Sequence, residues 1–98
     1  MAPPKLSPSE IEAALPRLPG WKLTDARLHR EYRFPDFIHA FGFMATAAVM
    51  IEALGHHPDW SNVYNRVTVD LSTHDAGGVT AKDVELAARL EEIARKLE

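Results

Sequence analysis

One long apolar segment limits what this chain can fold into more than any other feature. Between Asp36 and Gly55, a histidine, a threonine and a glutamate are the only polar side chains. Asp36 is a favourable N-cap and Gly55 suits the left-handed position that ends many helices, so we predict one helix over residues 37–54. A helix that is apolar on nearly every side must be covered on more than one side.

The length of residues 37–54 is also close to the lower limit for a membrane span. Glu52 near one end and small residues throughout argue against that alternative, and the flanking segments have the patterns of one soluble domain. A sheet of the same domain can cover one side of the helix, and a second subunit can cover the other. We therefore expect a homo-oligomer and no membrane partner.

Short alternating segments flank the long helix on both sides. Residues 21–24 and 27–34 precede it, and residues 60–64 and 67–72 follow it. Apolar and polar side chains alternate along residues 27–34, as in a strand with one buried face, although Arg30 breaks the alternation. The link within each pair is short, which favours two antiparallel hairpins.

A further helix is expected near each end of the chain, because each end has a capping box. Ser7 and Glu10 have the required spacing at the start, and Thr80 and Asp83 repeat it before the last apolar stripe. The connection over residues 75–78 contains two glycines and is expected to be a loop.

The predicted elements follow the order α-β-β-α-β-β-α. Short hairpin connections then predict an α+β fold, with a four-stranded antiparallel sheet and three helices packed on one face. A chain of 98 residues fits a single domain that spans residues 1–98. So small a core gains stability from oligomerisation, which agrees with the expectation for the long helix.

Composition excludes some classes of partner and chemistry. The net charge of −3, with scattered basic residues, argues against a nucleic-acid partner. The absence of cysteine excludes a disulfide, a thiol nucleophile and a thiolate metal site. The absence of cysteine favours a cytoplasmic location, and so does an N-terminal segment that lacks the apolar run of a signal peptide.

Histidines are concentrated where the long helix is predicted to end. His56 and His57 stand directly before Pro58, which keeps the residue before it out of helical geometry. His74 lies at the far end of the last predicted strand, on the same face as Thr68, Asp70 and Ser72. If the two strands after the long helix form a tight pair, the end of the second returns beside the start of the first. We therefore expect His74 to lie next to His56 and His57.

Three neighbouring imidazoles favour proton transfer on a small molecule, because imidazole gains and loses protons near neutral pH. A zinc site made by Glu52 and the three histidines is an alternative, although adjacent histidines seldom converge on one ion. A Ser-His-Asp triad through Ser61 or Ser72 lacks the motif that exposes a nucleophilic serine. Gly77 and Gly78 alone do not make a phosphate-binding loop. We therefore expect no metal.

Other side chains near the histidines have both a structural and a functional interpretation. Glu52 lies one helical turn before His56 and could orient an imidazole or bind a ligand, or could simply be exposed at the helix end that disfavours its charge. Asp83 caps the last helix and could also face the site. Trp60 and Tyr64 could form an aromatic wall for a flat ligand, or pack in the core.

Taken together, these residues resemble the pterin-4a-carbinolamine dehydratase family. The resemblance is carried by Gly-His-His-Pro-Asp-Trp-Ser-Asn-Val-Tyr-Asn from Gly55 and by Leu-Ser-Thr-His from Leu71, within a pattern that runs from Glu52 to Asp83. Trp21 after Pro-Gly and the Pro-Asp-Phe start of the long helix also match, so the resemblance covers nearly the whole chain.

The resemblance implies the fold predicted above, a dimer or tetramer, and a lyase that needs no cofactor. The implied reaction removes water from 4a-hydroxytetrahydropterin and gives the quinonoid dihydropterin. This step recycles tetrahydrobiopterin for an aromatic amino acid hydroxylase. The family also includes a transcriptional dimerisation cofactor and assembly factors for Rubisco, so a non-catalytic adaptor is the alternative function.

The resemblance also implies roles for individual residues. Three imidazoles would be catalytic by general acid–base chemistry: His56, His57 and His74. Of these, His56 and His74 are the best candidates for the proton-transfer pair, and His57 would bind the pterin. Three further residues would bind the substrate or support the site: Glu52, Trp60 and Asp83.

Overall fold

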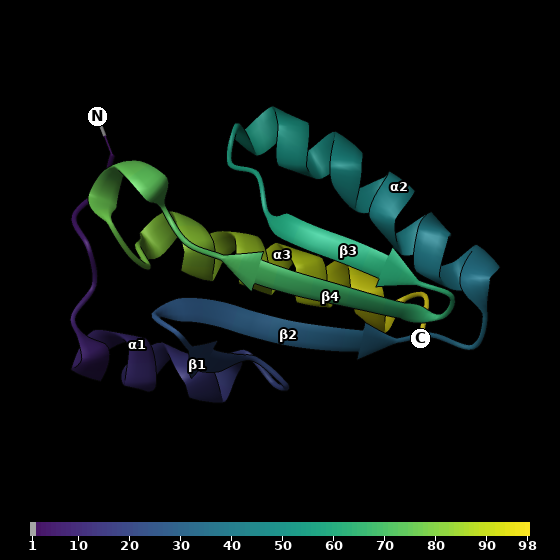
Figure 1. The fold of residues 1–98 in the computed structure, drawn as a ribbon, viewed down its shortest axis with the longest axis horizontal. Helices are drawn as coiled ribbons and strands as arrows, with labels where there is room; N and C mark the ends of the chain where they lie inside the picture. The colour runs from purple at the N-terminus through teal and green to yellow at the C-terminus, as the bar shows by residue number, and fades with distance from the viewer. Residues whose placement is uncertain (1) are drawn as a thin grey trace.

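Three helices and four strands alternate along the chain in the predicted order (Figure 1). The structure is a computed structural model that describes residues 2–98. Its elements are α1 (Pro8–Ala14), the 3-10 turn η1 (Leu15–Arg17), β1 (Lys22–Thr24), β2 (Arg27–Arg33), α2 (Phe37–Leu54), β3 (Asp59–Val63), β4 (Arg66–Leu71), the 3-10 turn η2 (His74–Ala76) and α3 (Ala81–Arg95). The α+β class is therefore confirmed.

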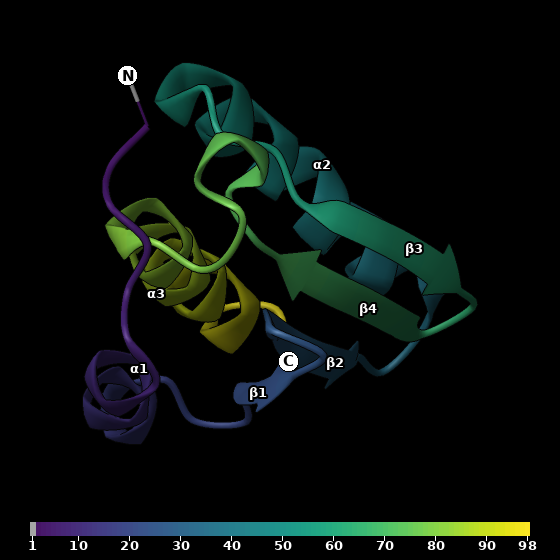
Figure 2. The same cartoon turned by 60° about the vertical axis from the view of Figure 1, so that its left-hand side comes forward.

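The four strands form one antiparallel sheet in the order β1-β2-β4-β3, so the second hairpin joins the first through β4. Helices α2 and α3 lie on one face of the sheet, and α1 lies at its β1 end (Figures 1 and 2). All three helices contribute to a single hydrophobic core on that face. Its largest fully buried apolar side chains are Tyr32, Phe43, Leu28, Leu71, Leu86 and Leu90.

Local signals in the sequence set the turns and the helix ends. Asp25 and Ala26 both have positive φ, 52° and 62°, as a two-residue hairpin loop between twisted strands requires. The Asp36 side chain accepts a hydrogen bond from the backbone N–H of His39 at 2.9 Å and caps α2. Gly55 ends the helix with φ of 68°, in the left-handed region predicted for it.

Arg30 interrupts the alternation of β2 because it belongs to a buried polar group on the inner face. Its guanidinium lies 4.1 Å from the centre of the Tyr32 ring, and its Nε is 3.4 Å from Oε1 of Glu91. The same Glu91 oxygen accepts hydrogen bonds from Tyr32 Oη at 2.8 Å and from Trp21 Nε1 at 3.1 Å. Burial and the negative charge of Glu91 together raise the pKa of Tyr32 well above its ordinary value.

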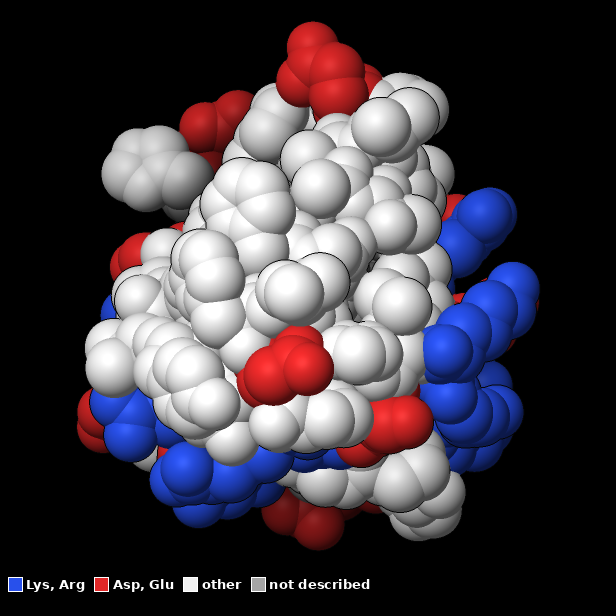
Figure 3. Space-filling view, turned by 90° about the vertical axis from the view of Figure 1, so that its right-hand side faces the viewer, with Lys and Arg blue, Asp and Glu red and all other residues white. Residues whose placement is uncertain are grey.

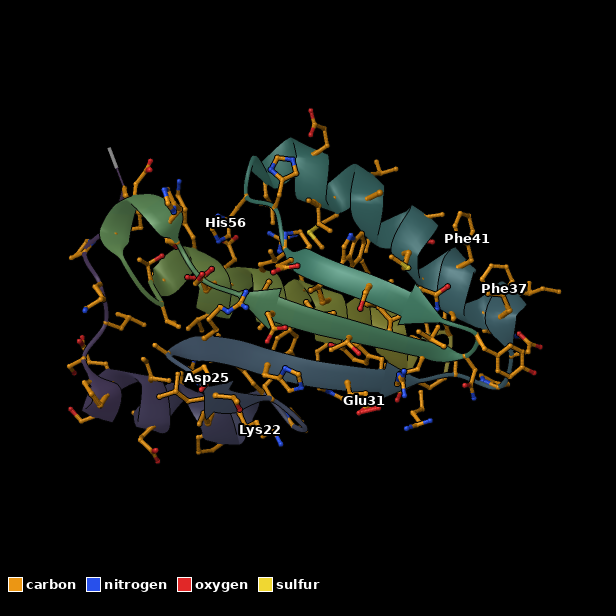
Figure 4. All side chains as sticks on the ribbon, in the orientation of Figure 1. Lys22, Asp25, Glu31, Phe37, Phe41 and His56 are labelled. Atoms are coloured by element: carbon orange, nitrogen blue, oxygen red, sulfur yellow. The ribbon has the colours of Figure 1, made fainter. Side chains whose placement is uncertain are left out.

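Helix α2 buries one side and leaves the other open. Ala40, Phe43, Ala47 and Ile51 face the core. By length and composition alone, α2 is apolar enough to cross a membrane, and 22% of it is buried. Large apolar side chains are exposed on its outer side: Phe37, Ile38, Phe41 and Val49. Phe37 and Phe41 project away from the sheet (Figure 4), and the surface at this end of the molecule is largely uncharged (Figure 3).

Candidate functional site

The pairing of β3 with β4 brings the histidines together, as predicted from the short hairpin. Asp59 at the start of β3 pairs with Asp70 near the end of β4, so the segment before β3 lies beside the segment after β4. A pocket of about 380 Å³ opens between these two segments and the start of α3. Its lining residues are Ala2, Gly55, His56, His57, Ser72, Thr73, His74, Asp75 and Lys82.

His56 is the most firmly held of the three imidazoles. Its Nε2 lies 2.5 Å from Oδ1 of Asp83, whose side chain is completely buried. Asp83 is the third residue of α3, and its Oδ2 accepts the backbone N–H of Thr80 at 2.8 Å to complete the predicted capping box. One carboxylate therefore both caps α3 and binds the His56 ring.

His57 has a weaker partner on the outside of the molecule. Its Nε2 lies 3.0 Å from Oε1 of Glu52, and the two side chains are 62% and 82% exposed. Solvent screens a pair this exposed, so it contributes little to stability. Glu52 does not line the pocket, and its contact with the site runs through His57.

His74 was expected at the far end of the last strand, but β4 ends at Leu71, and His74 instead begins the 3-10 turn η2, where it is exposed at the pocket. The backbone N–H groups of Ala76 and Gly77 both donate to the Thr73 carbonyl and close this turn. We expected residues 75–78 to be a simple loop, but Asp75 and Ala76 belong to the turn. A single turn leaves no periodic pattern in the sequence, because it is shorter than one repeat of a helical stripe.

Trp60 and Tyr64 do not line this pocket. The Trp60 ring packs edge to face on Phe43, with ring centres 6.5 Å apart, and belongs to the margin of the core. Tyr64 lies in the turn after β3, at the other end of that strand, and is 64% exposed. Apart from Ala2, the pocket residues described above carry polar side chains or, at Gly55, no side chain.

Thr73, Asp75 and Lys82 bring polar groups to the pocket that the sequence patterns did not single out. Thr73 donates its hydroxyl to Asp83, and Lys82 lines the pocket from the first turn of α3. The only sequence signal for these residues is their position, because Thr73 and Asp75 flank His74 and Lys82 directly precedes Asp83. In the described part of the chain, no group of three or more His, Asp or Glu side chains is arranged to hold a metal ion.

These features define a class of protein. Imidazole can donate or accept a proton near neutral pH, and a buried carboxylate behind one ring fixes its orientation. A small α+β domain with three imidazoles around one open, polar pocket is suited to moving protons on a small molecule.

The comparison with known proteins agrees with this class and makes it specific. The family model described as pterin 4 alpha carbinolamine dehydratase matches residues 4–93, so the chain belongs to that family. Family membership identifies a dehydratase, a lyase that acts on a pterin carbinolamine.

Similar proteins match along nearly their full length. A relative from Solibacter usitatus, named "Putative pterin-4-alpha-carbinolamine dehydratase", is 61% identical over 92% of this chain and 95% of its own. A relative of the same name from Opitutus terrae is 54% identical over 94% of this chain and 96% of its own. The crystal structure of a protein from Brucella melitensis, named transcriptional coactivator/pterin dehydratase, has a TM-score of 0.89 and 47% identity, covering 92% of this chain and 98% of its own.

Proposed function

We propose that this chain removes water from 4a-hydroxytetrahydropterin by general acid–base catalysis at its histidines and releases the quinonoid dihydropterin. The observation that carries the proposal is the meeting of His56, His57 and His74 at one pocket, with His56 held by a buried carboxylate. The reaction would recycle tetrahydrobiopterin in the cytoplasm, in support of an aromatic amino acid hydroxylase.

The reaction requires two proton transfers. The hydroxyl on C4a must gain a proton to leave as water, and the neighbouring ring nitrogen must lose one as the new double bond forms. We assign these transfers to His56 and His74, which line the same pocket from different segments. A positioned acid or base contributes about 100- to 10,000-fold to the rate.

The other site residues have supporting roles in this proposal. His57 binds the pterin. Glu52 orients the His57 ring, because its Oε1 lies 3.0 Å from Nε2 of His57. Asp83 orients the His56 ring through the contact between its Oδ1 and Nε2. Trp60 supports the strand that follows the histidines, because its ring packs on Phe43.

The proposal includes a homo-oligomer in which a second subunit covers the outer side of α2. The exposed apolar side chains of this helix support it, because contiguous apolar surface of this kind usually marks an interaction site. A non-catalytic adaptor is the second candidate function. The same open helix face favours it, and the similar Brucella protein is named a coactivator as well as a dehydratase.

A stopped-flow assay with 4a-hydroxytetrahydrobiopterin distinguishes the two functions. We expect the wild-type protein to accelerate dehydration and His74→Ala to lower kcat about 100-fold or more, while the fold and the oligomer persist. His39→Ala is the matched control, because His39 lies in the first turn of α2 and does not line the pocket. Equal, accelerated turnover by His74→Ala and wild type would refute the catalytic assignment of His74, whereas a wild-type rate no faster than the uncatalysed reaction would favour the adaptor.

A further inference from the structure

Two buried threonine hydroxyls form a hydrogen-bond network with Asp83, the carboxylate that contacts the His56 ring. Thr73, Thr80 and Asp83 are the buried polar residues where η2 meets α3. Oγ1 of Thr73 lies 2.7 Å from Oγ1 of Thr80 and 2.8 Å from Oδ2 of Asp83. Groups this deeply buried must satisfy their hydrogen-bonding capacity within the protein.

The donors and acceptors in this network determine which hydroxyl donates to which oxygen. Asp83 sits in the first turn of α3, and its Oδ2 accepts both the backbone N–H of Thr80 and the hydroxyl of Thr73, since a carboxylate only accepts hydrogen bonds. A hydroxyl has a single hydrogen to donate, so Thr73 donates to Asp83 and must accept from Thr80. Hydrogen bonds are therefore donated from Thr80 to Thr73 and from Thr73 to Asp83.

The carboxylate that these hydroxyls hold determines which nitrogen of His56 carries the hydrogen. Oδ1 of Asp83 faces Nε2 of His56 at 2.5 Å and, as an acceptor, requires a hydrogen on Nε2. The neutral ring then has an unprotonated Nδ1. Nδ1 has no hydrogen-bond partner among residues 2–98, and no buried side-chain nitrogen of those residues lacks one, so Nδ1 is not fully buried, on a ring that lines the pocket.

We infer that Thr73 and Thr80 are positioning residues for the proposed reaction: through Asp83 they hold His56 in the tautomer that presents Nδ1 to the substrate. This inference rests on the proposed function. Nδ1 takes the proton of the ring nitrogen beside C4a, and the electron pair of that N–H bond forms the C=N bond. The C4a–O bond breaks, and the hydroxyl leaves as water with a proton from a second, protonated imidazole of the pocket.

Thr73 also connects His56 to His74. Its side chain acts on His56 through Asp83, while its carbonyl closes the η2 turn that begins with His74. A side-chain substitution at this position therefore separates the two effects, because the backbone hydrogen bonds of the turn remain possible. Thr73→Val removes the hydroxyl with little change in shape, and Thr73→Ser keeps it.

The direct test is the tautomer of His56 in the full-length protein without substrate. The ¹⁵N chemical shifts of the ring distinguish protonated from unprotonated nitrogens, and the spectrum of His56→Gln assigns the signals. We expect hydrogen on Nε2 and none on Nδ1 in the neutral ring. In Asp83→Asn, the amide oxygen keeps the bonds from Thr73 and Thr80, so its NH₂ group faces Nε2, and we expect the hydrogen to move to Nδ1. A wild-type ring with hydrogen on Nδ1 would overturn the inference.

Kinetics test the roles of the hydroxyls. We expect Thr73→Val to lower kcat about 10-fold with KM changed less than about 2-fold, and Thr73→Ser to retain most of the activity. Thr68→Val is the matched control, because Thr68 lies on β4 outside the pocket. Unchanged kcat in a folded Thr73→Val would overturn the positioning role. If the wild type does not dehydrate the pterin at all, the proposed function fails, whereas the tautomer measurement still decides the hydrogen-bond assignment.

Discussion

Replacing Asp83 by alanine should destabilise the protein far more than replacing any other carboxylate at the pocket. The Asp83 side chain is completely buried and has three partners: the Thr80 N–H, the Thr73 hydroxyl and the His56 ring. Loss of the cap costs about 1 kcal/mol. A buried donor left without an acceptor adds about 1–3 kcal/mol, although the Thr73 hydroxyl can turn to Thr80 and reduce that cost.

Together these contributions predict a loss of about 2–4 kcal/mol for Asp83→Ala. That is a large part of the roughly 5–15 kcal/mol by which small domains are stable. Asp83→Asn keeps an acceptor for Thr73 and Thr80 and should lose only about 1–2 kcal/mol. Urea unfolding followed by circular dichroism measures both, at one protein concentration because an oligomer would make stability depend on it.

Asp75→Ala is the matched control, since Asp75 lines the same pocket but is exposed. Its free energy of unfolding should stay within about 0.5 kcal/mol of wild type. A loss below about 1 kcal/mol for Asp83→Ala would show that the buried carboxylate does not organise the site as described.

Two further predictions concern the outer helix face and the buried tyrosine. Val49→Asp places a charge on the exposed side of α2 and should dissociate the proposed oligomer to a monomer in sedimentation velocity; an unchanged sedimentation coefficient would place the interface elsewhere. Burial and Glu91 raise the pKa of Tyr32, so the native state keeps this proton above the ordinary value of 10.0, where the unfolded chain loses it. Stability should therefore fall as the pH rises past 10.0, and Tyr32→Phe should lessen that fall in alkaline urea unfolding; an equal fall in both proteins would contradict the assigned role of Tyr32.

Most of the fold was predictable because its signals are local. Asp36 and Gly55 mark the ends of α2 by their own side-chain and backbone preferences, and the two capping boxes mark the starts of α1 and α3. Arg30 shows the limit of such signals. Its place on the buried face becomes understandable only when Glu91, far along the chain, supplies the opposite charge.

The candidate site also has one part that was predictable from the sequence and one part that was not. The hairpin between β3 and β4 predicted that His74 would return to His56 and His57, since strand pairing follows from short connections. The role of Thr73 was not predictable, because a threonine after a strand has many partners available to it. Only the three-dimensional placement of α3 brings its hydroxyl to Asp83.

The central claim is that three imidazoles share one pocket that receives a flat bicyclic ring. The chain has five histidines, and His29 and His39 do not line the pocket, so they serve as internal references. Titration with 7,8-dihydrobiopterin, followed by the ring signals of all five in heteronuclear NMR, tests the claim most directly. We predict that His56, His57 and His74 shift together with one saturation curve while His29 and His39 stay in place. Signals of His74 that do not respond, or equal shifts at all five, would contradict the account.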